Sequence, residues 1–286
     1  MTDRVTVIMP DVSPVPEGEV ERSRRTHEDL IPTPGFFARW AYILLPAVTM
    51  VLILAVWEIY ARVKGINPLF FSYPSEIWRG FVTWYQGPLF GDLKTSATEF
   101  VVGLLLGAIG IPVGLVIGSV RRLSLALDPL INGLYSTPTL ALTPLFVIWF
   151  GLGLQSKVAI VTILAFFPLV INTADGVRTV DRQLVQAARS FGAHRIQLYR
   201  DVIFPGTLPF IVSGIRLAIG RAIIGVVIGE FIASVDGVGY RIRAAAASFR
   251  TAEYLAGVMV LIIFAIALTS LLKVAERRLA PWRTDE

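Results

Sequence analysis

Six stretches of about 20 mostly apolar residues divide this 286-residue chain. Each has the length that a helix needs to cross the hydrocarbon core of a lipid bilayer. We place these spans at residues 41–60, 97–120, 129–151, 157–177, 208–233 and 253–273. Because apolar residues make up 55% of the chain, a soluble domain is excluded. The sequence predicts an all-α integral membrane protein with six transmembrane helices.

The reactive residues that most enzymes and metal proteins need are scarce in this chain. It has no cysteine and only two histidines, His27 and His194, so we expect neither a disulfide framework nor a metal site. No G-x-x-x-x-G-K-[ST] phosphate loop is present. We therefore expect no ATP or Mg²⁺ site in this chain, and no enzymatic activity of its own.

The basic residues cluster at the ends of the apolar spans, which is typical of a membrane protein and not of a nucleic-acid-binding face. With the N-terminus inside, the inner segments hold twice as many lysines and arginines as the outer ones. This bias predicts that both termini are cytoplasmic. Residues 1–35 are polar and rich in proline, which predicts a disordered cytoplasmic tail before a transmembrane domain over residues 36–286.

The second and third spans carry contrasting patterns. Glycines recur every three or four residues in the second span, at Gly103, Gly107, Gly110, Gly114 and Gly118. This spacing predicts a face on which another helix packs closely.

The third span contains Pro138 and Pro144, so we expect it to be kinked. Its Thr137, Thr139 and Thr143 predict that it faces protein or water rather than lipid, and they are candidates for a translocation pathway.

Charges inside the fifth span are costly in a bilayer unless they are paired or hydrated. Arg216, Arg221 and Glu230 are therefore pathway candidates, together with Asn172 and Asp175 near the inner end of the fourth span. Arg216 lies near the cytoplasmic end and could instead extend its side chain to the interface. Arg221 could bind an anion, or it could pair with Glu230 of the same chain or of a second copy.

Residues 178–206 form a long polar segment between the fourth and fifth spans. We predict a helix over about 180–190, in which Ala187 and Ala188 let a partner approach the backbone closely. Gly192 suits a helix end with positive φ, and a second helix from about His194 is expected to end at Pro205. The segment is interpreted as the place where another protein binds.

Two outer segments also have helical character. In residues 61–96 we expect a short aromatic helix at the outer interface, with Ser75 as its N-cap. In residues 235–252, Arg241, Arg243 and Arg250 could meet either a docking protein or lipid headgroups.

The 178–206 segment resembles the EAA loop of ATP-binding-cassette importer permeases, whose pattern is E-A-A, three residues, G, nine residues, I, one residue, L-P. Ala187, Ala188, Gly192 and Pro205 match this pattern, whereas Gln186, Val202 and Phe204 depart from it. Residues 148–157 resemble the W-F-G-x-G-x-x-S-K stretch of the nitrate/sulfonate/taurine branch, and residues 237–240 resemble its G-x-G-Y motif. Together the likeness covers about residues 95 to 280.

The resemblance implies a type I importer (MetI-like) fold in the bacterial cytoplasmic membrane. It implies a homodimer of permease subunits, two cytoplasmic ATP-binding-cassette ATPase subunits that hold ATP and Mg²⁺, and an extracytoplasmic solute-binding protein. The transported solute would be a small organic or inorganic anion such as a sulfonate, taurine or nitrate. The residues that would couple this chain to the ATPase are Gln186, Ala187, Ala188, Arg189, Ser190, Gly192, Ala193 and Pro205.

An ATP-independent secondary transporter or channel is the rival hypothesis. Such a transporter would more often show internal repeats and interrupted helices in matching halves, and no convincing repeat is visible here. It would also leave the 178–206 segment without a role.

Overall fold

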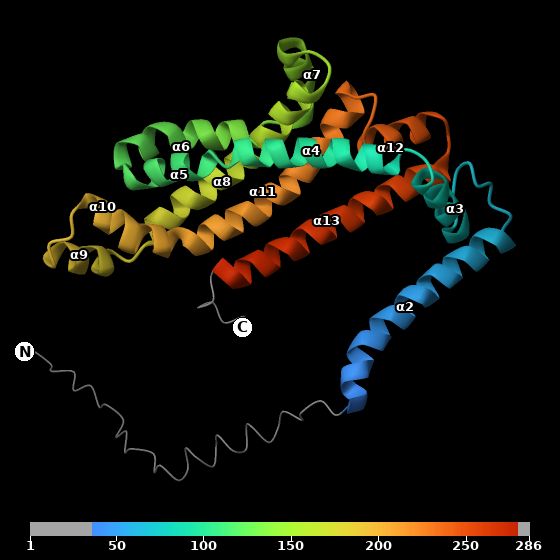
Figure 1. Ribbon diagram of the computed structural model, residues 1–286, viewed down its shortest axis with the longest axis horizontal. Helices are drawn as coiled ribbons and strands as arrows, with labels where there is room; N and C mark the ends of the chain where they lie inside the picture. The colour runs from blue at the N-terminus through green and yellow to red at the C-terminus, as the bar shows by residue number, and fades with distance from the viewer. Residues whose placement is uncertain (1–35, 280–286) are drawn as a thin grey trace, which may run out of the picture. The chain divides into compact units, whose positions relative to one another are not determined.

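The computed structural model describes residues 36–279, and every regular element in that part of the chain is a helix (Figure 1). The chain divides into two units, residues 1–59 and 60–286. The predicted disordered tail, residues 1–35, lies outside the described residues. The helices are α2 (Phe36–Val63), α3 (Pro74–Tyr85), α4 (Leu89–Gly107), α5 (Gly110–Ser119), α6 (Arg121–Ser136), α7 (Thr139–Phe150), α8 (Leu154–Thr179), α9 (Arg182–Ser190), α10 (Arg195–Leu198), the π-helix η1 (Tyr199–Ile203), α11 (Phe204–Ala233), α12 (Val238–Ala247) and α13 (Thr251–Leu279).

Five helical stretches between residues 36 and 279 are long and apolar enough to cross a membrane. They are Leu44–Val63, Leu89–Ser119, Leu154–Thr179, Arg195–Ala233 and Thr251–Leu271. They correspond to the predicted first, second, fourth, fifth and sixth spans. The second begins at Leu89 and not at residue 97, because the charged residues of its first turns lie in a helix that continues into the apolar part.

The predicted third span is not one kinked helix. It consists of α6 and α7, which meet at an angle of 94°. The break falls at Thr137 and Pro138, whose ψ angles of 132° and 101° are extended. A residue before proline is pushed out of the α region, so Pro138 ends α6, whereas Pro144 lies within α7. Counted as one broken span, this pair brings the total to six.

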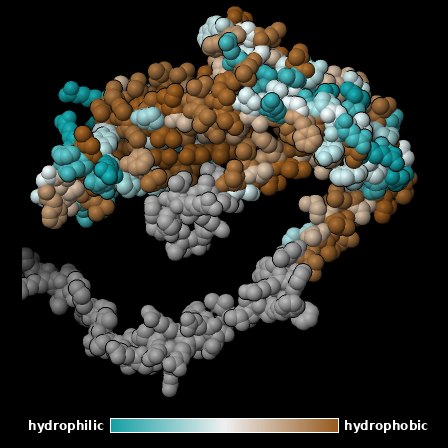
Figure 2. All heavy atoms as spheres, viewed as in Figure 1, coloured by the Kyte–Doolittle hydropathy of each residue, from teal (hydrophilic) through white to brown (hydrophobic). Residues whose placement is uncertain are grey.

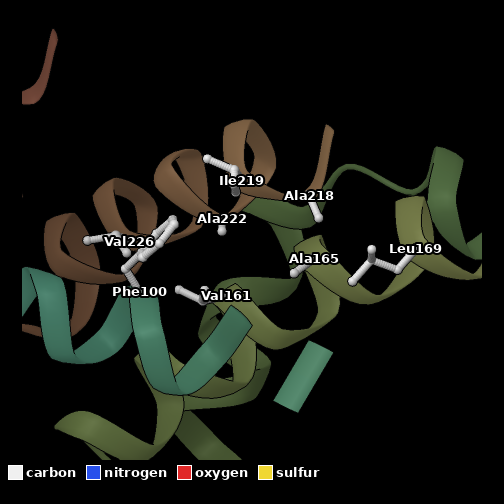
Figure 3. Packing of buried hydrophobic residues seen from close by; sticks show 8 residues of the cluster. All are labelled: Phe100, Val161, Ala165, Leu169, Ala218, Ile219, Ala222 and Val226. Atoms are coloured by element: carbon white, nitrogen blue, oxygen red, sulfur yellow. The ribbon is translucent and has the colours of Figure 1, made fainter. Parts of the chain in front are cut away.

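The core of residues 60–286 is the contact between α8 and α11, with α4 packed against both (Figure 3). Its buried side chains are Phe100 from α4, Val161, Ala165 and Leu169 from α8, and Ala218, Ile219, Ala222 and Val226 from α11. Lipid is as apolar as these side chains, so helix association in a membrane depends on close packing rather than on the hydrophobic effect. The three alanines among the eight residues allow that close approach.

The predicted glycine face of the second span is confirmed. A Cβ atom placed on Gly110 would lie 2.6 Å from the carbonyl oxygen of Phe166, and one on Gly114 would lie 2.5 Å from that of Val170. Real Cβ atoms do not approach so closely. The glycines of α4 and α5 therefore let this span lie directly against the backbone of α8.

Apolar side chains cover the middle of the helical bundle in residues 60–286, and polar side chains gather toward its two ends (Figure 2). One polar end carries α9 and α10, and the opposite end carries α3 and α12 (Figure 1). This distribution is the one that a bilayer requires of a protein that crosses it. The 178–206 segment and the predicted outer segments thus lie at opposite ends of the bundle.

The predicted aromatic helix of the outer segment is α3, but Ser75 is not its N-cap. Tyr73 holds the N-cap position without a side-chain bond, and Pro74 begins the helix. Proline suits the first helical position because its missing N–H has no partner there in any case. The Ser75 hydroxyl instead accepts a hydrogen bond from Arg62 at 2.9 Å.

Candidate functional site

The 178–206 segment begins with the short helix α9, close to the predicted bounds. Asp181 caps it, because its carboxylate accepts the backbone N–H of Gln183 at 2.7 Å. In this helix Gln186 and Ala187 are exposed and Ala188 is half-buried. Two consecutive alanines on a capped helix leave a surface that another protein can approach closely.

Gly192 ends α9 as predicted, with a φ of +82°. Its N–H donates to the Arg189 carbonyl at 2.9 Å, and the N–H of Ala193 donates to the Ala188 carbonyl at 3.0 Å. This pair of bonds is the Schellman motif, which turns the chain sharply at a left-handed residue. No atom lies within 4 Å of a Cβ placed on Gly192, so its backbone conformation, and not lack of space, is what favours glycine.

The second helix of the segment does not end at Pro205, contrary to the prediction. His194 and Gln197 form a capping box at the start of α10, and η1 follows and runs directly into α11. Pro205 occupies the first turn of α11, directly after η1. The N–H that proline lacks therefore falls where the helix changes from π to α, and the chain remains helical through this point. The segment is therefore continuous with the fifth span.

The two spans that carry the segment pack closely at its base. A Cβ placed on Gly176 of α8 would lie 2.6 Å from the Cβ of Phe210, and one on Gly206 would lie 3.1 Å from a methyl group of Val180. A force on α9 or α10 would therefore reach α8 and α11 together.

The segment exposes several large apolar side chains. Phe191 is 92% exposed, Ile196 is 74% exposed and Leu184 is 59% exposed. Arg182, Arg189 and Arg195 stand among them and are also exposed. Aromatic and arginine side chains are enriched where proteins meet, so this surface is suited to a protein partner.

Arg221 is exposed on α11, and its described contacts are with Tyr135 of α6. Its Nη2 donates to the Tyr135 hydroxyl at 3.2 Å, and its guanidinium carbon lies 5.2 Å from the centre of the ring. Gly220 beside it has nothing within 4 Å of a Cβ position. The cation therefore lies on an open face of the fifth span, within reach of a molecule on that face.

The other pathway candidates do not form a single group. Thr137, Thr143 and Asn172 each donate to a carbonyl four residues back in the chain, at Gly133, Thr139 and Pro168. Thr143 is fully buried, so it does not line an open surface in this conformation. Thr139 is half-buried and Arg216 is exposed.

Glu230 is fully buried and does not lie beside Arg221. One of its carboxylate oxygens accepts the Ser96 hydroxyl at 2.6 Å, and the other accepts the N–H of Gly239 at 2.5 Å. The pairing of Arg221 with Glu230 of the same chain is therefore not formed, since Arg221 contacts Tyr135 and Glu230 is bound by Ser96 and Gly239. Glu230 holds the start of α12 in place rather than facing a path.

A second buried acid, Glu99 of α4, forms an ion pair with Lys157 of α8. Lys157 also donates to the Ser234 hydroxyl at 2.9 Å. Glu99 is absent from the sequence-based candidates, although a carboxylate within a predicted span is the signal that selected Glu230. We call Asp92, Ser96, Glu99, Lys157 and Glu230 the polar cluster.

The polar cluster binds the first turn of α12. The N–H groups of Gly237, Val238 and Gly239 donate to Asp92, Ser96 and Glu230 respectively. A Cβ on Gly237 or Gly239 would collide with the Glu230 carboxylate. The Gly237-Val238-Gly239 motif is thus explained by the close approach of a buried acid to a helix N-terminus. A cleft of about 820 Å³ opens beside the cluster, lined in part by Lys94, Thr98, Asp236 and Arg241.

Comparison with known proteins agrees with this architecture. A Bacillus subtilis protein named as the aliphatic sulfonates transport permease SsuC is 37% identical over 85% of this chain and 87% of its own length. The taurine transport system permease protein TauC of Escherichia coli is 34% identical over 83% of this chain and 89% of its own. Among solved structures, a chain of the inward-facing MetNI methionine ABC transporter has a TM-score of 0.58 at 19% identity. That match covers 69% of this chain and 96% of the other, and it shows a shared fold.

A family model also matches this chain directly, over residues 110–285. The match includes the 178–206 segment, the fifth span and α12, which are the elements described above. The chain belongs to the family of binding-protein-dependent transport system inner membrane components, the permease subunits of ATP-binding-cassette importers.

Proposed function

We propose that this chain forms the membrane pathway of an ATP-driven importer for a small sulfonate, and that its 178–206 segment is the part gripped by the ATPase. The observation that carries the proposal is the geometry of that segment. A capped helix, a left-handed glycine and a second helix form a firm projection that is continuous with two packed spans. Its tip exposes Phe191.

The partners follow from the family. A permease of this kind needs two cytoplasmic ATP-binding subunits, an external solute-binding protein and a second permease subunit, for which a second copy of this chain is the simplest choice. The charge bias supports a cytoplasmic location for both termini and for the 178–206 segment. The cleft beside the polar cluster then faces the outside, where the binding protein would release its solute.

The substrate class rests on relatives and on one cation. Relatives are named for aliphatic sulfonates and taurine, whose sulfonate groups are anionic at all physiological pH values. Arg221 offers a guanidinium on an open face of the fifth span. A guanidinium binds oxyanions through parallel hydrogen bonds, and in an apolar span it would attract an anion more strongly than it would in water.

The mechanism we propose is alternating access. ATP closes the two ATPase subunits on each other, and each carries the 178–206 segment docked on it. Because that segment is joined to α8 and α11 at a tightly packed base, the displacement reaches the spans and opens the cavity outward. Hydrolysis then lets the segment return and the cavity face inward.

The test is reconstitution of the purified complex in proteoliposomes with its solute-binding protein. The proposal is supported if uptake of labelled taurine or of an alkanesulfonate requires ATP, supplied on the side of the membrane that carries the 178–206 segment. Uptake at the same rate without ATP would support the secondary-transporter hypothesis instead. A carboxylate of equal size, offered as competitor, separates sulfonate selectivity from general anion transport.

A further inference from the structure

The helix α6 is attached to the rest of the bundle in an unusual way. It has no buried residue along its whole length, Arg121–Ser136. Only partly buried side chains such as Leu127 and Ile131 pack it against the cluster of Ile117, Val170 and Ala174. Apolar packing alone therefore fixes the position of α6 only weakly, so the polar contacts of this helix contribute more to holding it in place.

One guanidinium supplies most of those polar contacts. Nη2 of Arg178, in the last turn of α8, lies 2.8 Å from both carboxylate oxygens of Asp128 and 2.6 Å from the hydroxyl of Ser124. Nη1 donates to Asp175 at 3.1 Å, and Ser124 donates to Asp128 at 2.9 Å. We call these four residues the Arg178 latch.

The latch lies at the base of the 178–206 segment. Arg178 precedes Asp181, the cap of α9, by three residues, so a displacement of α9 acts on the backbone that carries this guanidinium. The guanidinium is held through two nitrogens, with Nη2 at Asp128 and Nη1 at Asp175, so its direction as well as its distance is defined. The latch thus links the start of α9 to the middle of α6 through one side chain.

The far end of α6 carries a second contact. Tyr135 lies seven residues, or two helical turns, beyond Asp128 and therefore on the same face of α6. Its hydroxyl accepts the hydrogen bond from Arg221, and the 94° bend into α7 follows directly. Because no residue of α6 is fully buried within the chain, the helix can shift as a unit when the contact at Asp128 moves.

We propose that Arg178 is a positioning residue that makes α6 follow the 178–206 segment, so that ATP-driven movement of α9 shifts Tyr135 relative to Arg221. This inference rests on the proposed function, because it assigns the route by which a movement at the ATPase reaches the cation on the fifth span. The pair is partly exposed, with side chains 37% and 34% accessible. Such pairs contribute little to overall stability, so the latch can be altered without unfolding the protein.

The test uses the complete complex with its ATP-binding subunits and two readouts. The first is solute taken up per ATP hydrolysed. The second is the rate at which a maleimide labels Ser136→Cys at the exposed end of α6, compared between nucleotide-free and vanadate-trapped complex. The chain has no cysteine of its own, so this label is unique within the permease.

With Arg178 intact, we expect the two states to differ at least fivefold in labelling rate. Arg178→Ala should reduce that difference to less than twofold and lower uptake per ATP at least fivefold. Asp128→Asn, which keeps the shape of the side chain, should lower the labelling difference and the uptake per ATP to the same extent. It replaces the alanine variant in the test if Arg178→Ala fails to fold. Arg178→Lys, which keeps the charge, should retain at least half of both signals.

The matched control is Arg79→Ala, which removes an ion pair of 2.7 Å to Glu76 within the single helix α3. It should change neither readout. Normal labelling differences and normal uptake per ATP in both Arg178→Ala and Asp128→Asn would overturn the latch. Equal loss in Arg178→Lys and Arg178→Ala would also overturn it. If the unaltered complex showed no ATP-driven uptake, the proposed function itself would be lost, which is a separate outcome.

Discussion

The carboxylate of Glu230, inside the fifth span, accepts the backbone N–H of Gly239 at 2.5 Å. The bond ties α11 to the first turn of α12, and Ser96 of α4 completes the contact from the other side. Three helices therefore meet at one buried acid. An acid that would be costly in a bilayer if it had no partner is thus hydrogen-bonded within the chain, which makes this part of the molecule a fixed frame.

We predict that Glu230→Gln destabilises this frame. The amide presents an N–H where the carboxylate accepted one, so a buried donor is left without a partner at a cost of about 1–3 kcal/mol. The thermal midpoint in detergent should fall by roughly 2–10 °C. Glu253→Gln in α13, whose ion pair with Arg250 is partly exposed, is the control and should change the midpoint little.

The glycine face of the second span gives a second stability prediction. Gly114→Ala places a methyl group against the Val170 carbonyl, so α5 must move away from α8 at a cost of about 1–3 kcal/mol. Gly133→Ala in α6, where nothing lies within 4 Å, should be neutral or slightly stabilising. Equal thermal midpoints for the two variants would show that α5 and α8 do not pack as closely at Gly114 as the structure shows.

The turn at Gly192 is predicted to transmit force. Gly192→Val forces a β-branched residue into a φ of +82°, which costs at least about 1–2 kcal/mol and displaces α9 from α10. We expect normal insertion in the membrane but uptake per ATP lowered at least fivefold. Gly192→Asn should behave almost like the parent, because asparagine tolerates the left-handed region. Normal coupling in the valine variant would contradict the role of the turn.

Arg221→Ala is predicted to lower transport without disturbing assembly. Loss of a charged hydrogen bond to an anion is worth about 1.5–3 kcal/mol, which corresponds to a roughly ten- to hundredfold fall in uptake at low solute concentration. Arg221→Lys should retain part of the activity. Uptake and complex yield, measured on the same preparation, distinguish a pathway residue from a structural one, and unchanged uptake would remove Arg221 from the pathway.

Much of this fold could be predicted from the sequence, because apolar length and glycine spacing are local signals. Residues 103–118 show this well, since their glycines predict close helix packing before any partner is known. The end of α9 at Gly192 is equally local. Pro205 was harder to interpret, because a proline that could stop one helix can also lie in the first turn of the next.

The polar contacts could not be predicted because their partners are distant in the chain. Ser96 and Glu230 are separated by 134 residues, and Asp128 and Arg178 by 50. A charge near a span indicates that some partner exists, but only the packing of α4, α8 and α11 decides which one. Glu230 was therefore a pathway candidate by its charge, whereas its surroundings show that it holds α12.

The most direct test of the central claim, that the ATPase grips the 178–206 segment, is site-specific cross-linking in the assembled complex. Phe191→Cys places a thiol at the 92% exposed tip of the segment, and Val235→Cys places one at a position 85% exposed at the opposite end of the bundle. We predict that a bifunctional reagent joins the first variant, and not the second, to an ATP-binding subunit. The absence of a cross-link from position 191, or its labelling by an impermeant reagent added outside intact cells, would contradict the account.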